Sequence, residues 1–474
     1  MFGKEKHSEK EYDAYAQDVE IAPAVNREGD DLVYDAVFGE ISDSGPNYRG
    51  VGPVGSWVLI TKANIGLGIL GIPSVFMTVG LVPGILIILG LQSVIAYCGA
   101  QIGPFKRRHP EVYGIADAAY ILGGRVWKEI FFVVFWINMV MVFSTCIVSI
   151  STAINAISVH AACTAIWMVV AYVFGMMLGS VRTLGKITWI GWAGLISLVA
   201  SVLIVTIAVG VQDRPAAAPP APAPWDKDIK IFASATFQQV MGAISTVLFS
   251  YGAVPCNFSI ISEMRDHRVY VKSMSYSIFF LTAAYLIIGC VVYHYCGQYV
   301  SSPALGSAGP LLKKISYGIA LPALIASLTL FAHIPAKHIF VRILSGSPHL
   351  TSNTPTHWIT WELCILAGST LGYILASAVP TFGAIIGLIG SVVVPLTAIC
   401  PYPVMWWHDN FRFKPSNERT AKLWLGLVLN FLIFLIGLFI WVAGTWAAVK
   451  DIIAASATTG PWTCKDNSGS VKEE

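Results

Sequence analysis

Residues 61–73 read TKANIGLGILGIP, and they lie inside an apolar stretch long enough to cross a membrane as a helix. The stretch contains one lysine, one asparagine, three glycines and one proline. Glycine and proline weaken a helix, and an unpaired backbone group is costly in hydrocarbon. Such a break is tolerated where the freed groups face protein, water or a ligand. We therefore expect residues 64–73 to line a cavity, with a kink or close helix packing as the alternative.

The rest of the chain has the composition of a membrane protein. Of its 474 residues, 55% are hydrophobic and 12% are charged, and the mean hydropathy is +0.67. A soluble protein has about twice that share of charged residues. Apolar runs of about twenty residues recur, whereas ten-residue strands of alternating polarity are not seen. The sequence therefore predicts an all-α polytopic membrane protein.

The apolar runs predict about eleven membrane-spanning helices. Their approximate bounds are 57–80, 83–105, 126–155, 163–182, 186–211, 237–262, 273–298, 311–343, 358–378, 380–407 and 421–449. The division between the ninth and tenth spans is the least distinct. Residues 1–55 are polar and are expected to be a disordered tail, and residues 451–474 form a second tail.

Lysine and arginine are distributed unevenly between the two sets of loops. With the amino terminus in the cytoplasm, the inner loops hold 16 of these residues and the outer loops hold 5, tails excluded. Cytoplasmic loops are enriched in them, so we expect a cytoplasmic amino terminus and, after an odd number of spans, an extracellular carboxyl terminus. Cys163, Cys296 and Cys464 fall near the outer side. A disulfide is possible there, but sequence cannot assign the pair.

A second break lies in the sixth expected span, where residues 250–255 read SYGAVP. Interrupted helices at corresponding positions of two halves indicate a transporter built from inverted repeats. We expect repeats at about 57–211 and 237–407, each of five helices with its first helix broken, followed by one extra helix. In this architecture, half-helix amino-terminal ends face an anionic group and unwound carbonyls face a cationic one. An α-amino acid carries both groups.

The segments around the two breaks resemble one family of membrane proteins. ITKANIGLGILGIP (60–73), FSYGAVPCNFSIISEMRD (249–266) and the eleven-helix layout resemble the amino acid/auxin permease family. Within it, VYDAVFGEIS (33–42) and RGVGPVGSW (49–57) are similar to fungal neutral amino acid permeases of the methyltryptophan-resistance type. The resemblance covers essentially the whole chain outside the proline-rich loop 214–224 and the tail ends. It implies secondary active uptake of neutral amino acids, driven by protons or sodium.

The candidate substrate-binding residues flank the two breaks. They are Asn64, Ile65, Gly66 and Gly68 at the first break, and Phe249, Ser250, Tyr251 and Gly252 at the second. By the resemblance, the polar position and the glycines of the first break border the substrate, and the second break lies opposite. Phe249 and Tyr251 could shape a pocket for bulky apolar side chains, although aromatic residues also serve core packing.

Four residues are candidates for ion coupling. Lys62 and His333 are titratable groups in expected spans, where ionisable residues are often functional. The alternatives are a Lys62 that reaches the cytoplasmic interface and a His333 that is hydrogen-bonded in the core. By resemblance to sodium-coupled relatives, Ser327 and Thr329 lie near an ion site. They are two positions apart, which places them about 200° apart on a regular helix.

Glu263 follows the sixth span beside Arg265 and Asp266, where it could gate the transport path or form an ion pair. The sequence contains no nucleophile elbow, phosphate loop or metal-ligand spacing, so we expect no enzyme activity, no metal and no cofactor. We also expect no nucleic-acid partner. The leading interpretation is a plasma-membrane proton symporter that imports neutral amino acids by alternating access. A sensor with the same fold, a vacuolar exporter and a channel are the alternatives.

Overall fold

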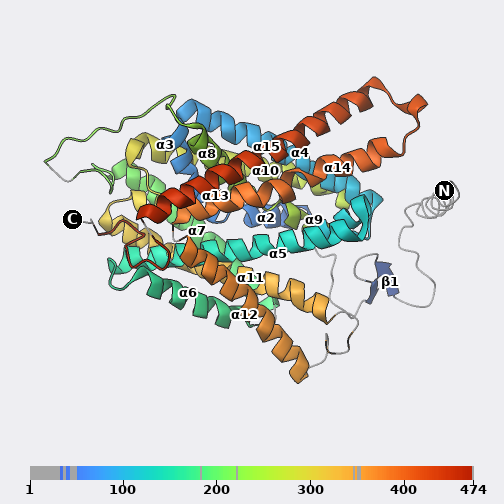
Figure 1. Cartoon of the computed structure of the whole chain (residues 1–474), viewed down its shortest axis with the longest axis horizontal. Coiled ribbons are helices and arrows are strands. Elements are labelled where there is room, and N and C mark those ends of the chain that lie inside the picture. The colour runs from blue at the N-terminus through green and yellow to red at the C-terminus, as the bar shows by residue number, and fades with distance from the viewer. Residues whose placement is uncertain are drawn as a thin grey trace.

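Long helices lie side by side along the longest axis of the molecule in the computed structural model (Figure 1). The structure describes residues 32–35, 39–42, 51–181, 184–219, 222–344, 347, 349, 354–379, 381–458 and 460–471. In this part of the chain, eight helices are long and apolar enough to cross a membrane, and two bent pairs raise the number to ten. The shorter apolar helix Thr164–Gly179 makes eleven. The predicted fold class is confirmed, and the number of apolar helices is compatible with the expected eleven spans.

The helices follow the expected spans closely. The region expected to be the first repeat contains α2 (Pro53–Asn64), η1 (Leu67–Gly71), α3 (Ile72–Val79), α4 (Leu81–Arg108), α5 (Ile115–Ser158), α6 (Thr164–Gly179) and α7 (Leu184–Val211). The region expected to be the second repeat contains α8 (Phe237–Ser250), η2 (Val254–Cys256), α9 (Asn257–Ser262), η3 (His267–Val269), α10 (Tyr270–Cys296), η4 (Gly297–Tyr299), η5 (Ala304–Ser307), α11 (Pro310–Ile343), α12 (Pro355–Ala378), α13 (Phe382–Val392), η7 (Pro395–Ile399), α14 (Pro401–Trp407) and η8 (His408–Arg412). After η9 (Ser416–Glu418), α15 (Ala421–Thr458) is the extra helix.

Three helices differ from their expected bounds. α5 begins at Ile115 and bends at Gly124, whose φ of 77° suits a residue without a Cβ. α15 continues to Thr458, so part of the expected carboxyl-terminal tail is helical. The tenth span is a third broken helix, because residues 382–392 and 395–412 are bent by 41° on either side of residues 393–394. Pro395 begins the second half of this span, where a missing N–H is tolerated.

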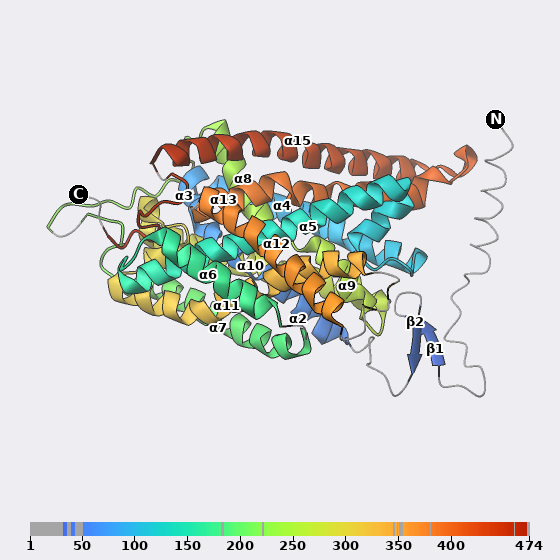
Figure 2. The same cartoon turned by 60° about the horizontal axis from the view of Figure 1, so that its bottom comes forward.

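The helices form two groups. α2, α3, α4, α8 and α10 pack against one another, and α5, α6, α7, α11 and α12 form the second group. α13 packs against α8, α5 and α15, and α15 lies along one side of the bundle (Figure 2). Gly390 permits the close contact of α13 with α8, because a Cβ there would lie 1.8 Å from the Ser245 carbonyl oxygen.

The chain that enters α2 is paired with the chain that leaves α9. Val51 donates its N–H to the Glu263 carbonyl at 3.1 Å, and Arg265 donates to the Val51 carbonyl at 3.0 Å. Upstream, a hairpin that the sequence analysis did not predict joins β1 (Leu32–Asp35) to β2 (Gly39–Ser42) in antiparallel register. The rest of the tail that we expected to be disordered, up to residue 50, lies outside the described residues.

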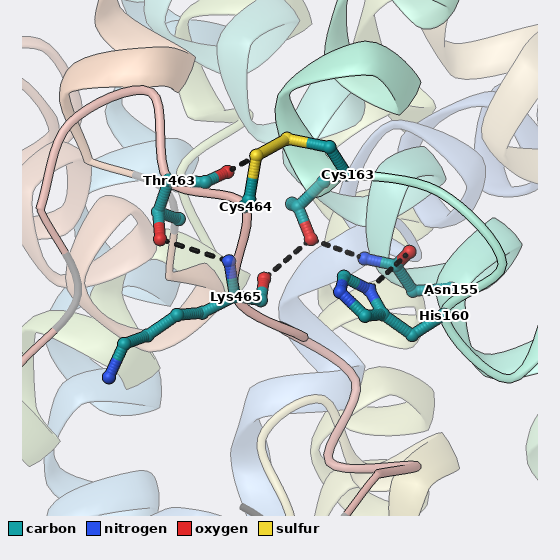
Figure 3. Close-up of a disulfide and its surroundings, with 7 residues drawn as sticks. Asn155, His160, Cys163, Thr463, Cys464 and Lys465 are labelled. Atoms are coloured by element: carbon teal, nitrogen blue, oxygen red, sulfur yellow. Dashed lines mark hydrogen bonds between the residues drawn. A yellow bond between two sulfur atoms is a disulfide. The ribbon is translucent and has the colours of Figure 1, made fainter.

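A disulfide joins the carboxyl-terminal tail to the start of α6. Cys163 and Cys464 form this bond (Figure 3), while Cys296, the third cysteine near this side, is buried with a free thiol. Beside the disulfide, Thr164 donates its hydroxyl to the Lys465 carbonyl at 2.6 Å. The tail is therefore bound to the same end of the bundle by a covalent bond and by hydrogen bonds.

The tail also carries a charged turn that contacts the second helix group. Lys313 of α11 donates its ammonium group to the Ser468 carbonyl at 2.6 Å. Burial alone would raise the pKa of the Asp466 carboxyl, but hydrogen bonds from Ser468, Ser470 and Val471 lower that pKa below its ordinary value. The Asp466 carboxylate thus organises the turn that Lys313 holds in place.

Candidate functional site

The first helix break separates α2 from η1. The two halves of this span are bent by 46°. The Ile65 N–H still bonds to Thr61 O at 2.7 Å, and the Gly66 N–H turns back to Asn64 O at 2.9 Å. The first N–H groups of η1, which starts at Leu67, have no partner inside their own helix. Beside Gly66 there is open space, since an added Cβ would meet no atom within 4 Å.

The second break follows α8, which ends at Ser250. The Tyr251 N–H bonds to Leu248 O and the Gly252 N–H bonds to Phe249 O, each at 3.1 Å. These bonds tighten the end of the helix, and α9 begins only at residue 257. Ser250 and Tyr251 are buried, and Phe249 is half-buried. Both breaks therefore occur where the glycines and prolines of the sequence predicted them.

The breaks lie directly against each other. A Cβ added to Gly68 would come within 2.6 Å of the Ser250 Cα and Oγ atoms. A Cβ added to Gly252 would lie 3.0 Å from the Cγ2 atom of Val394, which belongs to the break in the tenth span. Three interrupted helices consequently meet at one place, and the sequence identified two of them.

Helix α10 contributes hydroxyl groups to this place. Tyr285 is fully buried, and its hydroxyl lies 3.2 Å from Asn64 O and 3.0 Å from Ser250 O. Tyr251 shares a hydrogen bond of 2.8 Å with Thr282, and its ring meets the Tyr285 ring edge to face with centroids 5.2 Å apart. The sequence analysis missed both α10 residues. Their signal is a pair of polar groups three positions apart on one face of an apolar helix.

Asn64 has an unused hydrogen-bond acceptor at the first break. Its side chain is 5% exposed, and its Nδ2 group donates to Ile60 O at 3.0 Å. The Oδ1 atom is buried with no hydrogen-bond partner among the described residues. A buried amide oxygen of this kind is uncommon in folded proteins, and it can accept a hydrogen bond from a ligand.

Lys62 lies in the last turn of α2 and is half-buried. Among the hydrogen bonds and ion pairs of the described residues, none involves its ammonium group. Thr61, its neighbour, shares a hydrogen bond of 2.9 Å with Ser277 of α10. Lys62 therefore lies close to the first break along the chain. The hydrogen bond between Thr61 and Ser277 attaches its helix to α10.

The other three candidates for ion coupling lie on α11. His333 is fully buried, its Nδ1 atom lies 3.3 Å from Gly179 O, and its ring packs edge to face on Trp361. His333 therefore lies on α11 and packs against α6 and α12. Thr329 donates its hydroxyl to Ile325 O within its own helix, and Ser327 is half-buried. No hydrogen bond among the described residues joins these three side chains to either break.

Glu263 lies where α9 ends, beside the pairing with the entering chain. Burial raises the pKa of its carboxyl above the ordinary value. Its backbone carbonyl accepts the hydrogen bond from Val51. The ion pairs of the described residues do not include one between Glu263 and Arg265.

A cavity of about 180 Å³ lies between α3, α8, α13 and α15. It reaches Thr246, four residues before the end of α8, and Ser74, in the first turn of α3. Asp451 of α15 contributes a carboxylate to the lining and accepts a hydrogen bond of 2.5 Å from Gln238. The sequence analysis missed Asp451, because it had ended the last span at residue 449.

A polar cluster joins the ends of α4 and η8. The His109 Nε2 and His408 Nδ1 atoms each lie 3.0 Å from the Asp409 Oδ1 atom. These ligand-type atoms lie within 4.8 Å of one another. Arg108 occupies the other carboxylate oxygen at 3.3 Å, which makes the cluster a hydrogen-bonded ion-pair network. Sequence spacing could not reveal it, because the residues come from distant segments.

The sequence model of the family described as "Transmembrane amino acid transporter protein" matches residues 49–450. The chain belongs to the transmembrane amino acid transporter family. A "Transmembrane transporter" of Gibberella moniliformis is 34% identical over 442 residues, which cover 92% of each chain. The "N amino acid transport system protein" of Neurospora crassa is 28% identical over 402 residues, which cover 84% of this chain and 83% of the relative.

Solved structures share the fold of this amino acid transporter at low sequence identity. MhsT in complex with L-phenylalanine has a TM-score of 0.51 at 12% identity, over 82% of this chain and 98% of the other. Mhp1 with bound bromovinylhydantoin has a TM-score of 0.51 at 13% identity, over 90% of this chain and 97% of the other. The family points to a transporter of amino acids, and the family predicted from the sequence is confirmed.

Proposed function

We propose that this transporter imports neutral L-amino acids, aliphatic and aromatic, by proton symport with alternating access. The observation that carries the proposal is the direct contact of two helix breaks, at Gly68 and Ser250. Each break frees backbone groups that a regular helix would pair internally. A site of this kind offers donors for a carboxylate and acceptors for an ammonium group within a few ångströms of each other.

The backbone groups of the first break suit the two charged ends of an amino acid. The free N–H groups at the start of η1 would bind the carboxylate, and the open space beside Gly66 allows its approach. The carbonyls of Asn64 and Ser250 and the unpartnered Asn64 Oδ1 would accept from the ammonium group. Ile65 belongs to the backbone of the first break, and Gly252 belongs to the backbone of the second.

The surroundings of the breaks favour a neutral substrate side chain. Phe249 and Tyr251 provide apolar surface, and among the described residues no carboxylate forms a hydrogen bond or ion pair at the breaks. A basic side chain would lack a partner there, which is costly within a membrane. MhsT, which shares the fold, is described with L-phenylalanine, so an aromatic amino acid is a reasonable substrate for this architecture.

Lys62 is the coupling group that we propose. It is half-buried in the last turn of α2, two residues before Asn64. A buried ammonium group can release its proton in one conformation and bind it again in another when its surroundings change. His333 contacts Gly179 of α6 and Trp361 of α12, has no hydrogen bond to either break among the described residues, and is the weaker candidate. Ser327 and Thr329 are on a regular stretch of α11, which does not favour a shared sodium site.

We propose a plasma-membrane location with the carboxyl terminus outside and Glu263 at the cytoplasmic rim. The disulfide between Cys163 and Cys464 supports this orientation, because such bonds persist in oxidising compartments. The excess of lysine and arginine in the opposite loops agrees with it. An epitope tag after residue 474 should be reached by antibody on intact cells. A tag that needs permeabilisation of the cells would contradict the orientation.

Uptake of labelled leucine and tryptophan by transport-deficient yeast cells that express this chain tests the proposal. Uptake should rise as the external pH falls from about 7 to 5, because the proton is taken up together with the substrate. It should collapse with a protonophore and be unchanged when choline replaces sodium. Excess unlabelled leucine should compete and excess lysine should not. Binding without uptake would favour the sensor alternative, and sodium dependence would overturn the coupling.

A further inference from the structure

One hydroxyl group connects both helix breaks. The Tyr285 oxygen is 3.2 Å from Asn64 O, the last carbonyl of α2, and 3.0 Å from Ser250 O, the last carbonyl of α8. Both distances exceed the usual length of about 2.7–2.8 Å for a hydroxyl donor to oxygen. A tyrosine hydroxyl has one proton, and a carbonyl can only accept. The two carbonyls therefore share one hydroxyl proton, and Asn64 O also accepts the Gly66 N–H at 2.9 Å.

The surroundings hold the Tyr285 hydroxyl in this position. The side chain is fully buried, and the Tyr251 ring packs against it edge to face. Tyr251 is itself anchored through its hydroxyl to Thr282, on the same helix as Tyr285. Gly68 rests against Ser250 with no room for a Cβ, so the two broken segments cannot move closer together. The ring contact and this backbone contact fix the distance between the breaks.

We propose that Tyr285 is a positioning residue that holds the two breaks at the spacing the substrate needs, while its single proton can go to only one carbonyl and leaves the other able to accept from the substrate's ammonium group. This inference rests on the proposed function, because it assigns the ammonium end of the amino acid to the same site. When the ammonium group donates to one carbonyl, the hydroxyl proton goes to the other. One hydroxyl proton thus serves both carbonyls when the site is empty, and the ammonium group adds a further donor when the substrate is bound.

The alternative is that Tyr285 has a purely structural role. α10 contains a suitable comparison in Tyr270, which is fully buried and donates its hydroxyl to the Gly99 carbonyl at 3.1 Å. Gly99 lies in α4, outside both breaks. Tyr285→Phe and Tyr270→Phe each remove one hydroxyl that bonds to backbone, and each keeps the ring. They differ in the contact that is lost, because the Tyr285 hydroxyl contacts both breaks and the Tyr270 hydroxyl contacts α4.

The test is the concentration dependence of leucine uptake by the two variants, corrected for the amount of protein in the membrane. We expect Tyr285→Phe to raise the half-saturating concentration about three- to tenfold, as the loss of one hydrogen bond implies. The maximal rate should stay within about twofold, because the loss acts on substrate binding. Both variants should lower the melting temperature by similar amounts, because each loses one buried hydrogen bond. Tyr270→Phe should leave the half-saturating concentration unchanged. Equal effects of the two variants on half-saturation, or no effect of Tyr285→Phe, would overturn the proposal.

A second substitution keeps the test decisive if Tyr285→Phe does not accumulate. Replacing Tyr285 by 3-fluorotyrosine preserves the ring and hydroxyl and makes the hydroxyl a stronger donor. Half-saturation should then fall below the wild-type value, and an unchanged or raised value would overturn the positioning role. Absence of leucine uptake by the wild-type chain would refute the proposed function instead, so the two failures are distinguishable.

Discussion

Gly68→Ala is the substitution that most directly probes the contact between the breaks. The added Cβ would lie 2.6 Å from both the Cα and the Oγ atom of Ser250, and 2.9 Å from its Cβ. The Oγ atom could rotate away, but the Cα atom is backbone and cannot. The two breaks must therefore separate by several tenths of an ångström or more. This displacement also lengthens the bonds of Tyr285 to the two carbonyls.

The magnitude follows from the type of contact. Overpacking of a buried contact by one methyl group costs about 1–3 kcal/mol. Gly68→Ala should lower the melting temperature of the purified protein and reduce uptake roughly five- to hundredfold, since about 1.4 kcal/mol corresponds to a factor of ten. Gly68→Val, with its larger side chain, should abolish uptake.

Two glycines with open surroundings are the matched controls. Gly90→Ala in α4 meets no atom within 4 Å and should leave both stability and uptake at the wild-type level or above. Gly66→Ala also meets no atom within 4 Å, so its melting temperature should be normal. Its uptake should nevertheless fall, because the methyl group would occupy the space assigned to the substrate carboxylate.

The assay combines thermal unfolding in detergent, monitored by size-exclusion chromatography, with uptake of labelled leucine corrected for membrane abundance. A Gly68→Ala protein that melts and transports like the wild type would refute the inference that the breaks are in tight contact. A Gly66→Ala protein with normal uptake would leave the contact intact and refute the position of the carboxylate.

Two further predictions concern the tail and the coupling group. Cys464→Ser should destabilise the protein by about 2–4 kcal/mol, and its melting temperature should match that of the wild type treated with a reductant; a melting temperature that neither change lowers would show that the disulfide is unimportant for stability. Lys62→Met keeps the length of the side chain and removes its charge, so uptake should lose its response to external pH while exchange of internal for external substrate continues. A Lys62→Met protein that still concentrates leucine in response to a proton gradient would place the coupling group elsewhere.

The local chemistry of the chain was sufficient to predict much of the fold. The apolar runs predicted the spans, and the glycines and prolines around Gly66 and Tyr251 predicted two of the breaks. The break at residues 393–394 was missed, because a single proline after a run of valines also fits an ordinary kink. α15 was ended too early, since Lys450 and Asp451 resemble the polar end of a span.

The site was predictable only where it is local in sequence. Asn64 and Ser250 could be predicted because glycines and prolines lie beside them in the sequence. Tyr285 acts through a tertiary contact that its neighbours in sequence do not reveal. His333 illustrates the same limit, because sequence identifies a histidine in a span but not the helix it faces. The partner of Cys163 was undetermined for a related reason, as several cysteines lay near one side.

Reconstitution of the purified protein into liposomes tests the central claim most directly, because it removes every other transporter. Labelled leucine uptake would be measured with an inward proton gradient, with an inward sodium gradient at uniform pH, and with neither. The account predicts accumulation of leucine above equilibrium only with the proton gradient, together with its loss in Gly68→Val. Accumulation driven by sodium alone, or no accumulation under any gradient despite leucine binding, would contradict it.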